Sequence, residues 1–341
     1  MELGERAGDT EPPGSGSDIG LLERILVPLD GSIPSEAVLR QVHPFLCGDR
    51  NEAILFHAWT RESPLALDGE IQEITQAEEY LEGTARRLKS GGGRARHLVL
   101  KSGVAEGILE AARSERATLV AMSTHGKGTS AGEPYAGTVE QVLCGSRTPL
   151  FLARGYEPSF VDEDAAAPCR PSPIRRILVP LDGLTGCEAV MPYARELGLF
   201  LGALIVVLHV APSDLHDPES IRGATIGDRS SAPEPGEDAS PEERVEHVAK
   251  AFSTSGLNTM IVHLGGEPMS SILSFARPSA VDLIAMTTHR RIGPSGLEIG
   301  SIAVDVMRKA ILPTLLVRAD SSGTSSGTWS QSLGHERSSS P

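Results

Sequence analysis

The sequence of 341 residues has few aromatic residues, few cysteines and no long apolar run. Because Phe, Trp and Tyr make up only 4% of the chain, its cores must be built mainly from Leu, Val, Ile and Ala. The four cysteines are scattered without CxxC spacing, which indicates a reducing compartment and no metal site. No apolar run approaches the roughly 18 residues that span a bilayer. We therefore expect a cytoplasmic protein without a membrane partner.

Positive charge is also scarce, since the formal net charge is -14 at pH 7. This argues against general binding to nucleic-acid backbones, which needs faces rich in Lys and Arg. Binding of a single nucleotide is not excluded by the net charge, because only the few residues around the nucleotide recognise it. The sequence contains no Gly-x4-Gly-Lys-Ser/Thr, no His-Glu-x2-His and no Gly-x-Ser-x-Gly. P-loop and hydrolase chemistry therefore have no basis in the motifs, and we expect a protein that is not an enzyme.

What the sequence does have is an internal repeat. The segment RILVPLDG at residues 24–31 recurs unchanged at residues 176–183. Later matches, such as Thr124-His125 with Thr288-His289, lie further apart in the chain, so the second half carries an insertion. The insertion falls at about residues 212–241, which are rich in Ser, Pro, Gly, Asp and Glu. Such a composition buries little apolar surface, and we expect a poorly ordered acidic loop there.

Each half alternates short apolar strands with helices. The expected strands are 25–29, 53–58, 97–101, 118–123 and 150–153 in the first half, and 177–181, 204–210, 260–264, 283–287 and 314–317 in the second. This alternation predicts an α/β fold of two tandem, doubly wound, five-stranded parallel sheets.

The predicted domains follow from the same repeat and from shifts in composition. The sequence predicts a disordered tail over residues 1–20, domain 1 over 21–154, a linker over 155–173, domain 2 over 174–319 and a disordered tail over 320–341. The acidic loop lies within domain 2.

Candidate binding residues follow the predicted strands. In an open parallel sheet, ligands bind beyond the carboxyl ends of the strands, where the strand order reverses. Asp30-Gly31 and residues 123–129 lie there in the first half, and Asp182-Gly183 and residues 287–290 in the second. Glycines at such ends let backbone N–H groups approach a phosphate. The alternative, that Asp-Gly only turns the chain, is equally compatible with the sequence.

Taken together, the sequence resembles two tandem universal stress protein domains of the UspA type. The likeness rests on RILVPLDG in each half, on strands that end at His57 and at His209, on Gly-Glu-Pro at 266–268, and on Thr-His after the fourth strand. It covers about residues 22–154 and 174–319. The resemblance implies an adenine nucleotide alpha hydrolase-like, Rossmann-like fold and a non-enzymatic role in the stress response. It also implies binding of ATP, ADP or AMP, with Mg²⁺ held only through the nucleotide.

In ATP-binding members of that family, the fourth strand is followed by Gly-x2-Gly-x9-Gly-Ser/Thr, and neither half has the whole pattern. In the first half, Ser123 replaces the first glycine, and Gly137-Thr138 completes the pattern only if one residue is inserted. In the second half, Thr287 and Arg290 replace two glycines. The implied nucleotide-binding residues are Asp30, Gly31, His125, Gly126, Gly128, Gly137 and Thr138, and, in the second half, Asp182, Gly183, His289, Arg290, Gly300 and Ser301.

The two implied sites are not equivalent. Arg290 would either block close backbone approach or bind a phosphate itself. We expect nucleotide in the first half and a blocked second site. His57 and His209 are interpreted as core-edge histidines with satisfied hydrogen bonds. The alternative function is a structural adaptor in which both sites have decayed. An adenine-nucleotide-using enzyme is disfavoured, because Ser-Gly-Gly-x-Asp-Ser is missing after the first strand.

The resemblance also concerns assembly. Family members commonly dimerise through their last strand, which corresponds here to Leu150–Ala153 and Thr314–Val317. Both segments are short and apolar, and an unpaired strand edge tends to find a partner. We expect the two strands to meet within the chain as a pseudo-dimer, with a homodimer as the alternative.

Overall fold

The computed structural model describes residues 20–46, 50–60, 67–125, 136–154, 174–184, 186–211, 222–225, 239–288, 290–293, 296–299 and 301–319. The first half contains β1 (Arg24–Pro28), α1 (Ile33–Val42), β2 (Glu52–Trp59), α2 (Leu67–Ser90), β3 (Arg94–Lys101), α3 (Val104–Ser114), β4 (Leu119–Ser123), α4 (Ala136–Gly145) and β5 (Leu150–Ala153). The second half contains β6 (Arg176–Leu181), α5 (Met191–Leu201), β7 (Leu204–Ala211), β8 (Arg222–Thr225), α6 (Pro241–Thr254), β9 (Thr259–Gly265), α7 (Pro268–Ala276), β10 (Leu283–Thr288), β11 (Arg290–Gly293), β12 (Gly296–Ile299), α8 (Ser301–Lys309) and β13 (Thr314–Arg318).

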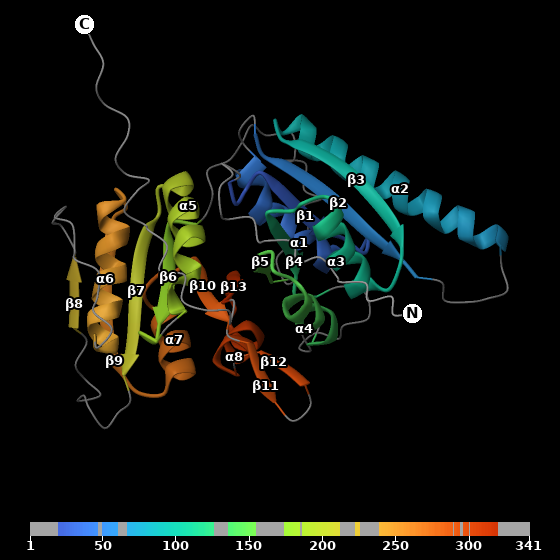
Figure 1. Ribbon diagram of the computed structural model, residues 1–341. Helices are drawn as coiled ribbons and strands as arrows, with labels where there is room; N and C mark the ends of the chain where they lie inside the picture. Colours follow the sequence, from blue (N-terminus) through green and yellow to red (C-terminus); the bar gives the residue numbers. More distant parts are fainter. Residues whose placement is uncertain are drawn as a thin grey trace, which may run out of the picture.

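The two halves have the same parallel core. The strand order is β3-β2-β1-β4-β5 in the first half and β13-β10-β6-β7-β9-β8 in the second (Figure 1). Ile25 in β1 lies between Ala53 and Leu119 of the neighbouring strands. Ile177 in β6 lies in the same way between Ile205 and Leu283. The repeated RILVPLDG segments therefore occupy the same place in both halves, which confirms the predicted tandem α/β fold.

Local sequence explains where two important helices begin. Ser32 is the N-cap of α1, where its hydroxyl accepts from the N–H of Ser35 at 3.3 Å. Ser240 caps α6 in the same way, and the Glu243 carboxylate accepts from the Ser240 N–H at 2.8 Å. This reciprocal capping box satisfies two backbone donors that the helix itself leaves unpaired. Both helices start beside the carboxyl edge of the sheet, since α1 follows β1 in the chain and the first residue of α6, Pro241, lies against Gly183.

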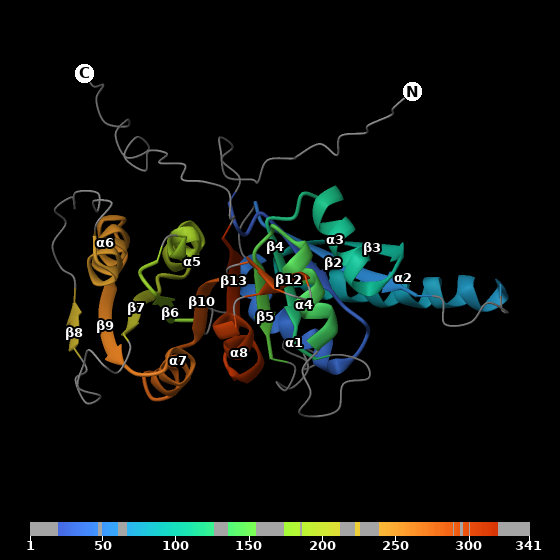
Figure 2. The same cartoon turned by 60° about the horizontal axis from the view of Figure 1, so that its bottom comes forward.

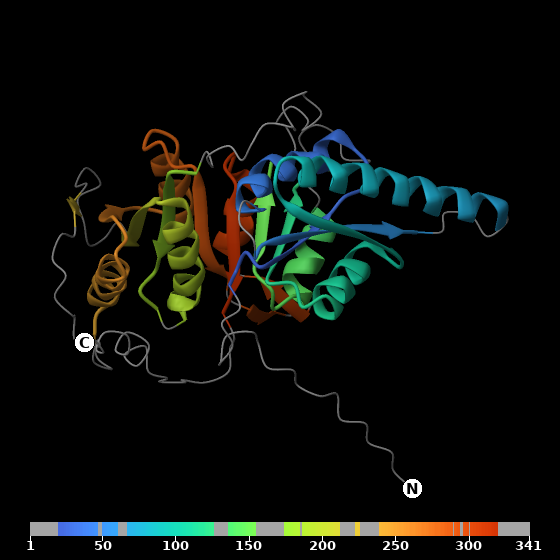
Figure 3. The same cartoon turned by 90° about the horizontal axis from the view of Figure 1, so that it is seen from above.

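Within the described residues, the two halves join into one eleven-stranded sheet. β5 pairs antiparallel with β13, with Phe151 opposite Leu315. The two strands run side by side at the centre of the molecule (Figures 2 and 3), and β3 and β8 are the two edge strands of the sheet. Because equivalent strands pair antiparallel, the two halves are related by an approximate two-fold axis near the Phe151–Leu315 pair. These are the strands through which the sequence analysis expects the halves to meet.

Arginines at the ends of the two joining strands reinforce this symmetry. Arg154 donates to the carbonyl oxygens of Met307 and Arg308, at 2.9 and 3.0 Å, at the end of α8. Arg318 donates to the Cys144 carbonyl of α4 at 3.2 Å. Each guanidinium thus caps a helix C-terminus of the other half, where the last carbonyls lack intrahelical partners.

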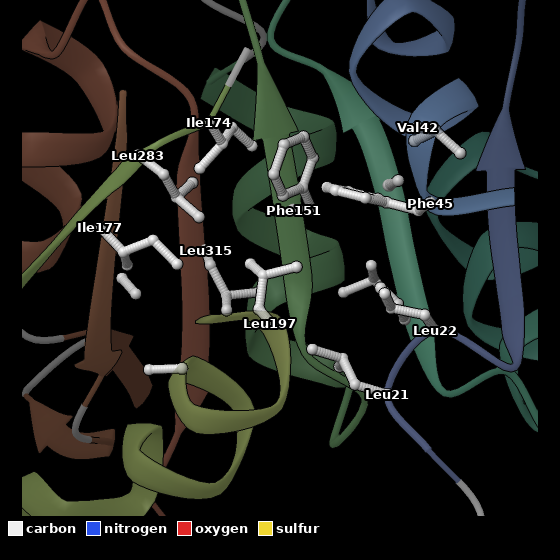
Figure 4. Close-up of a cluster of buried hydrophobic side chains, with 14 of the residues drawn as sticks. Leu21, Leu22, Val42, Phe45, Phe151, Ile174, Ile177, Leu197, Leu283 and Leu315 are labelled. Carbon is white, nitrogen blue, oxygen red and sulfur yellow. The ribbon is translucent and has the colours of Figure 1, made fainter. Parts of the chain in front are cut away.

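Apolar side chains cover both faces of the sheet. One face packs against α1, α2, α5 and α6 and the other against α3, α4, α7 and α8, and both clusters run across the two halves. Phe151 and Phe45 meet edge to face, with ring centroids 5.7 Å apart. Close by, Leu315 and Leu197 of the second half continue the same cluster (Figure 4). The joining strands are therefore part of the core itself.

The structure differs from the sequence-based expectation in two places. The segment expected to be an acidic loop contains strand β8, which pairs antiparallel with β9, so the second half contributes six strands to the large sheet. Arg290, expected in a loop, begins β11 of a two-stranded hairpin with β12. The tails at 1–19 and 320–341 and the linker at 155–173 lie outside the described residues. Among the helices that the structure describes, none is long and apolar enough to cross a membrane.

Candidate functional site

A pocket opens in the first half at the carboxyl ends of β1, β2 and β4. Leu29 and Phe56 form part of its apolar wall, and Asp30, Ser35 and Thr138 bring polar groups to it. Its volume is about 90 Å³, below the range of about 300–1,000 Å³ that is typical of small-molecule sites. The pocket is therefore too small to enclose a typical small-molecule ligand whole.

The Asp30-Gly31 turn forms one side of this pocket. Asp30 Oδ1 accepts from the Ser32 N–H at 2.9 Å, which makes an Asx turn. Gly31 has a φ of +79°, a left-handed conformation that favours glycine. No atom lies within 4 Å of the place where a Cβ of residue 31 would be. The turn is thus both a chain reversal and an open backbone surface, so the two readings of Asp-Gly are compatible here.

Two histidines stand at the inner wall. His57 Nδ1 lies 2.8 Å from the Leu29 carbonyl oxygen. Because a carbonyl only accepts, Nδ1 carries the proton in this arrangement. His57 is therefore a core-edge histidine with a satisfied hydrogen bond, as the sequence analysis expects.

His125 is almost entirely buried, and its Nδ1 lies 2.9 Å from the Thr124 hydroxyl. Burial, and then the charge of Arg154, lower the pKa of His125 below its usual value. The lowered pKa favours the neutral form of the imidazole, which adds no positive charge to the site.

Two of the expected phosphate-binding residues of the first half, Gly137 and Thr138, lie at the start of α4. Thr138 lines the pocket, and Gly137 in the same turn is exposed. Nothing lies within 4 Å of a Cβ built on Gly137. The N-terminus of this ten-residue helix therefore borders the pocket, and its backbone donors and dipole favour an anion. Gly126 and Gly128 lie outside the described residues.

The equivalent turn in the second half is covered. Asp182 Oδ1 accepts from the Leu184 N–H at 3.0 Å, and Gly183 has a φ of +68°, so the turn itself matches the first half. A Cβ on Gly183 would, however, lie 2.4 Å from the Pro241 carbonyl oxygen. The start of α6 therefore packs onto the backbone that is open at Gly31. His289 and Gly300 lie outside the described residues, as do the side chains of Arg290 and Ser301.

Sequence reasoning missed most of the pocket wall. Phe56, Ala58 and Met122 line it, and they alternate along strands with residues that face the opposite core. That alternation is readable in the sequence, but the register that brings β2 and β4 to either side of β1 is not. In the part of the chain that the structure describes, no group of three or more His, Cys, Asp or Glu side chains is placed to hold a metal ion.

Comparison with known proteins agrees with this architecture. The model of the universal stress protein family matches residues 22–154 and 173–318. A universal stress protein from Archaeoglobus fulgidus superimposes with a TM-score of 0.65 at 18% identity, covering 87% of this chain and 98% of the other. A functionally unknown protein from Pseudomonas aeruginosa gives 0.56 at 14% identity, covering 88% and 93%. These identities show a shared fold. No curated protein matches the sequence significantly.

Proposed function

The chain belongs to the universal stress protein family, and we propose that it is a non-enzymatic stress-response protein that binds one adenine nucleotide in its first half. Family membership supports the role in the stress response. The proposal of a single site rests on one observation, which is that the Gly31 backbone is open whereas Pro241 covers Gly183.

The pocket suits the two ends of a nucleotide differently. Its lining is mostly apolar, with Asp30 and Ser35 among the few polar residues, so it favours a flat base with a few polar groups. The phosphates would lie outside it, along the start of α4 near Gly137 and Thr138, where backbone donors favour an anion. ATP, ADP and AMP share this binding mode, and Mg²⁺ would be held through the phosphates alone.

A binding role agrees with the state of the polar side chains. Asp30 Oδ1 accepts a backbone hydrogen bond within its own turn. His125 is buried with a lowered pKa and lies beside the Thr124 hydroxyl. The Thr124 hydroxyl is within hydrogen-bond distance of this imidazole, but it is buried and does not line the pocket. A catalytic nucleophile has to reach the bound ligand. The site is therefore better suited to holding a nucleotide than to transforming it.

Calorimetric titration with ATP, ADP and AMP tests the proposal. Ala58→Leu adds apolar carbons to the pocket wall, and Val210→Leu places the same side chain at the equivalent position of β7, where the increase in size is smaller. We expect at least a tenfold loss of ATP affinity for Ala58→Leu and no change for Val210→Leu. If purified wild-type protein binds none of the three nucleotides, the adaptor alternative replaces this proposal.

A further inference from the structure

The second half contains a pair of histidines that the proposed nucleotide site does not use. His209 lies near the carboxyl end of β7, and His263 is its register partner on β9. Both side chains extend from the sheet face that α5 and α6 cover. Their Nδ1 atoms are 3.4 Å apart. The rings are nearly perpendicular, with centroids 5.5 Å apart and an interplanar angle of 83°.

The distance between the two nitrogens is informative. At 3.4 Å it is at the long end of the range for a hydrogen bond between the two rings. A metal ion bound at 2.0–2.1 Å to two imidazole nitrogens, at a tetrahedral angle, holds them about 3.3–3.4 Å apart. We propose that His209 and His263 form a binding site for a divalent transition-metal ion such as Zn²⁺, with the two Nδ1 atoms as protein ligands and water in the remaining positions.

The chemistry of the pair sets the class of ion. Two neutral imidazoles suit Zn²⁺, Co²⁺, Ni²⁺ and Cu²⁺, whereas Mg²⁺ and Ca²⁺ prefer oxygen ligands. Each ring would keep its proton on Nε2, and the ion would lie beside the line that joins the two Nδ1 atoms. His209 is almost entirely buried, but His263 is only half-buried. The ion therefore has access to the pair from the His263 side.

The first half provides an internal comparison. His57 occupies the place of His209, but its register partner on β3 is Val99. Its Nδ1 contacts the Leu29 carbonyl. The two-histidine arrangement therefore arises from one substitution between the halves, with His263 in the place of Val99. It is independent of the nucleotide proposed for the first half.

Calorimetric titration of the full chain with ZnCl₂, after dialysis against a chelator, tests the site. His263→Val installs the residue that the first half already has at this place, so the variant should fold, and circular dichroism checks that it does. His97→Gln removes an exposed imidazole on β3 and serves as the matched control. MgCl₂ is the control ion.

We expect the wild type and His97→Gln to bind one Zn²⁺ per chain in the same step. The affinity of that step should fall at least tenfold in His263→Val, and the melting temperature should rise with ZnCl₂ only where the pair is intact. MgCl₂ should give no such step. Equal Zn²⁺ binding by wild type and His263→Val would overturn the proposal. An absence of Zn²⁺ binding by the wild type would also overturn it, because the pair would then be only a hydrogen bond between histidines.

Discussion

The seam between the two halves should be among the most sensitive places in the molecule. Phe151 is fully buried, packs edge to face on Phe45 and lies opposite Leu315 across the antiparallel β5–β13 pair. Truncation of a fully buried phenylalanine to alanine typically costs about 3–5 kcal/mol. The transfer free energy of the ring is lost, and the cavity that the ring leaves behind adds a further cost. Single domains have about 5–15 kcal/mol in total. We therefore expect Phe151→Ala to lower the free energy of unfolding by about 3–5 kcal/mol.

Urea unfolding followed by circular dichroism measures this loss, with Phe200→Ala as the control. Phe200 lies on α5 and is 42% exposed, so Phe200→Ala should lower the free energy of unfolding by much less than Phe151→Ala does. Leu315→Ala is also expected to cost about 2–5 kcal/mol.

The double variant Phe151→Ala/Leu315→Ala tests whether the two halves interact through Phe151 and Leu315. Residues in contact show coupling energies of about 0.5–3 kcal/mol in a double-mutant cycle. Additive effects of Phe151→Ala and Leu315→Ala, or a loss below about 1 kcal/mol for Phe151→Ala, would refute the packed seam.

Three further predictions follow from the same geometry. Gly31→Ala should lower the free energy of unfolding by about 1–2 kcal/mol in thermal or urea unfolding, because of its positive φ alone. Gly183→Ala should lower it clearly more, because its Cβ would also meet Pro241. Equal losses in the two variants would show that α6 does not cover the turn at Gly183. Arg154→Ala and Arg318→Ala should each lower the free energy of unfolding by about 1–3 kcal/mol, because the two arginines cap equivalent helices. A tenfold difference between the unfolding equilibrium constants of the two variants would contradict the two-fold symmetry. Burial and Arg154 lower the pKa of His125 in the folded protein, so the unfolded chain binds the proton more readily. The contribution of neutral His125 to the free energy of unfolding is therefore present above the unfolded pKa of about 6.5. It is lost as the pH falls below that value. Urea titrations at pH 5.5 and 7.5 should show that loss in wild type and a smaller one in His125→Gln, and an unchanged pH dependence would exclude His125 as a source.

Much of the fold can be predicted from the sequence, because its signals are local or repeated. RILVPLDG is a short apolar run ended by Asp-Gly, and its recurrence fixes β1 and β6 as equivalent central strands. Each strand expected from the apolar runs is present, with ends shifted by a few residues. The place of Asp30 and Gly31 at the carboxyl edge follows from the general behaviour of parallel sheets.

The remaining features depend on contacts between distant segments. β8 has only four residues in an acidic, Pro-rich stretch, and it is a strand because β9 offers a free edge for pairing. The contact between Gly183 and Pro241 depends on where the insertion returns to the sheet. The sequence does show the Ser-Pro-Glu-Glu start of α6, but not what that start touches. Likewise, His209 and His263 become neighbours only through strand register.

The number of ATP molecules bound per chain tests the central claim most directly, and native mass spectrometry of wild type, Ala58→Leu and Val210→Leu measures it. The account predicts one ATP per chain in the wild type and in Val210→Leu, and none in Ala58→Leu at the same concentration. Two ATP molecules per wild-type chain, or a single one that Val210→Leu removes and Ala58→Leu leaves in place, would contradict it.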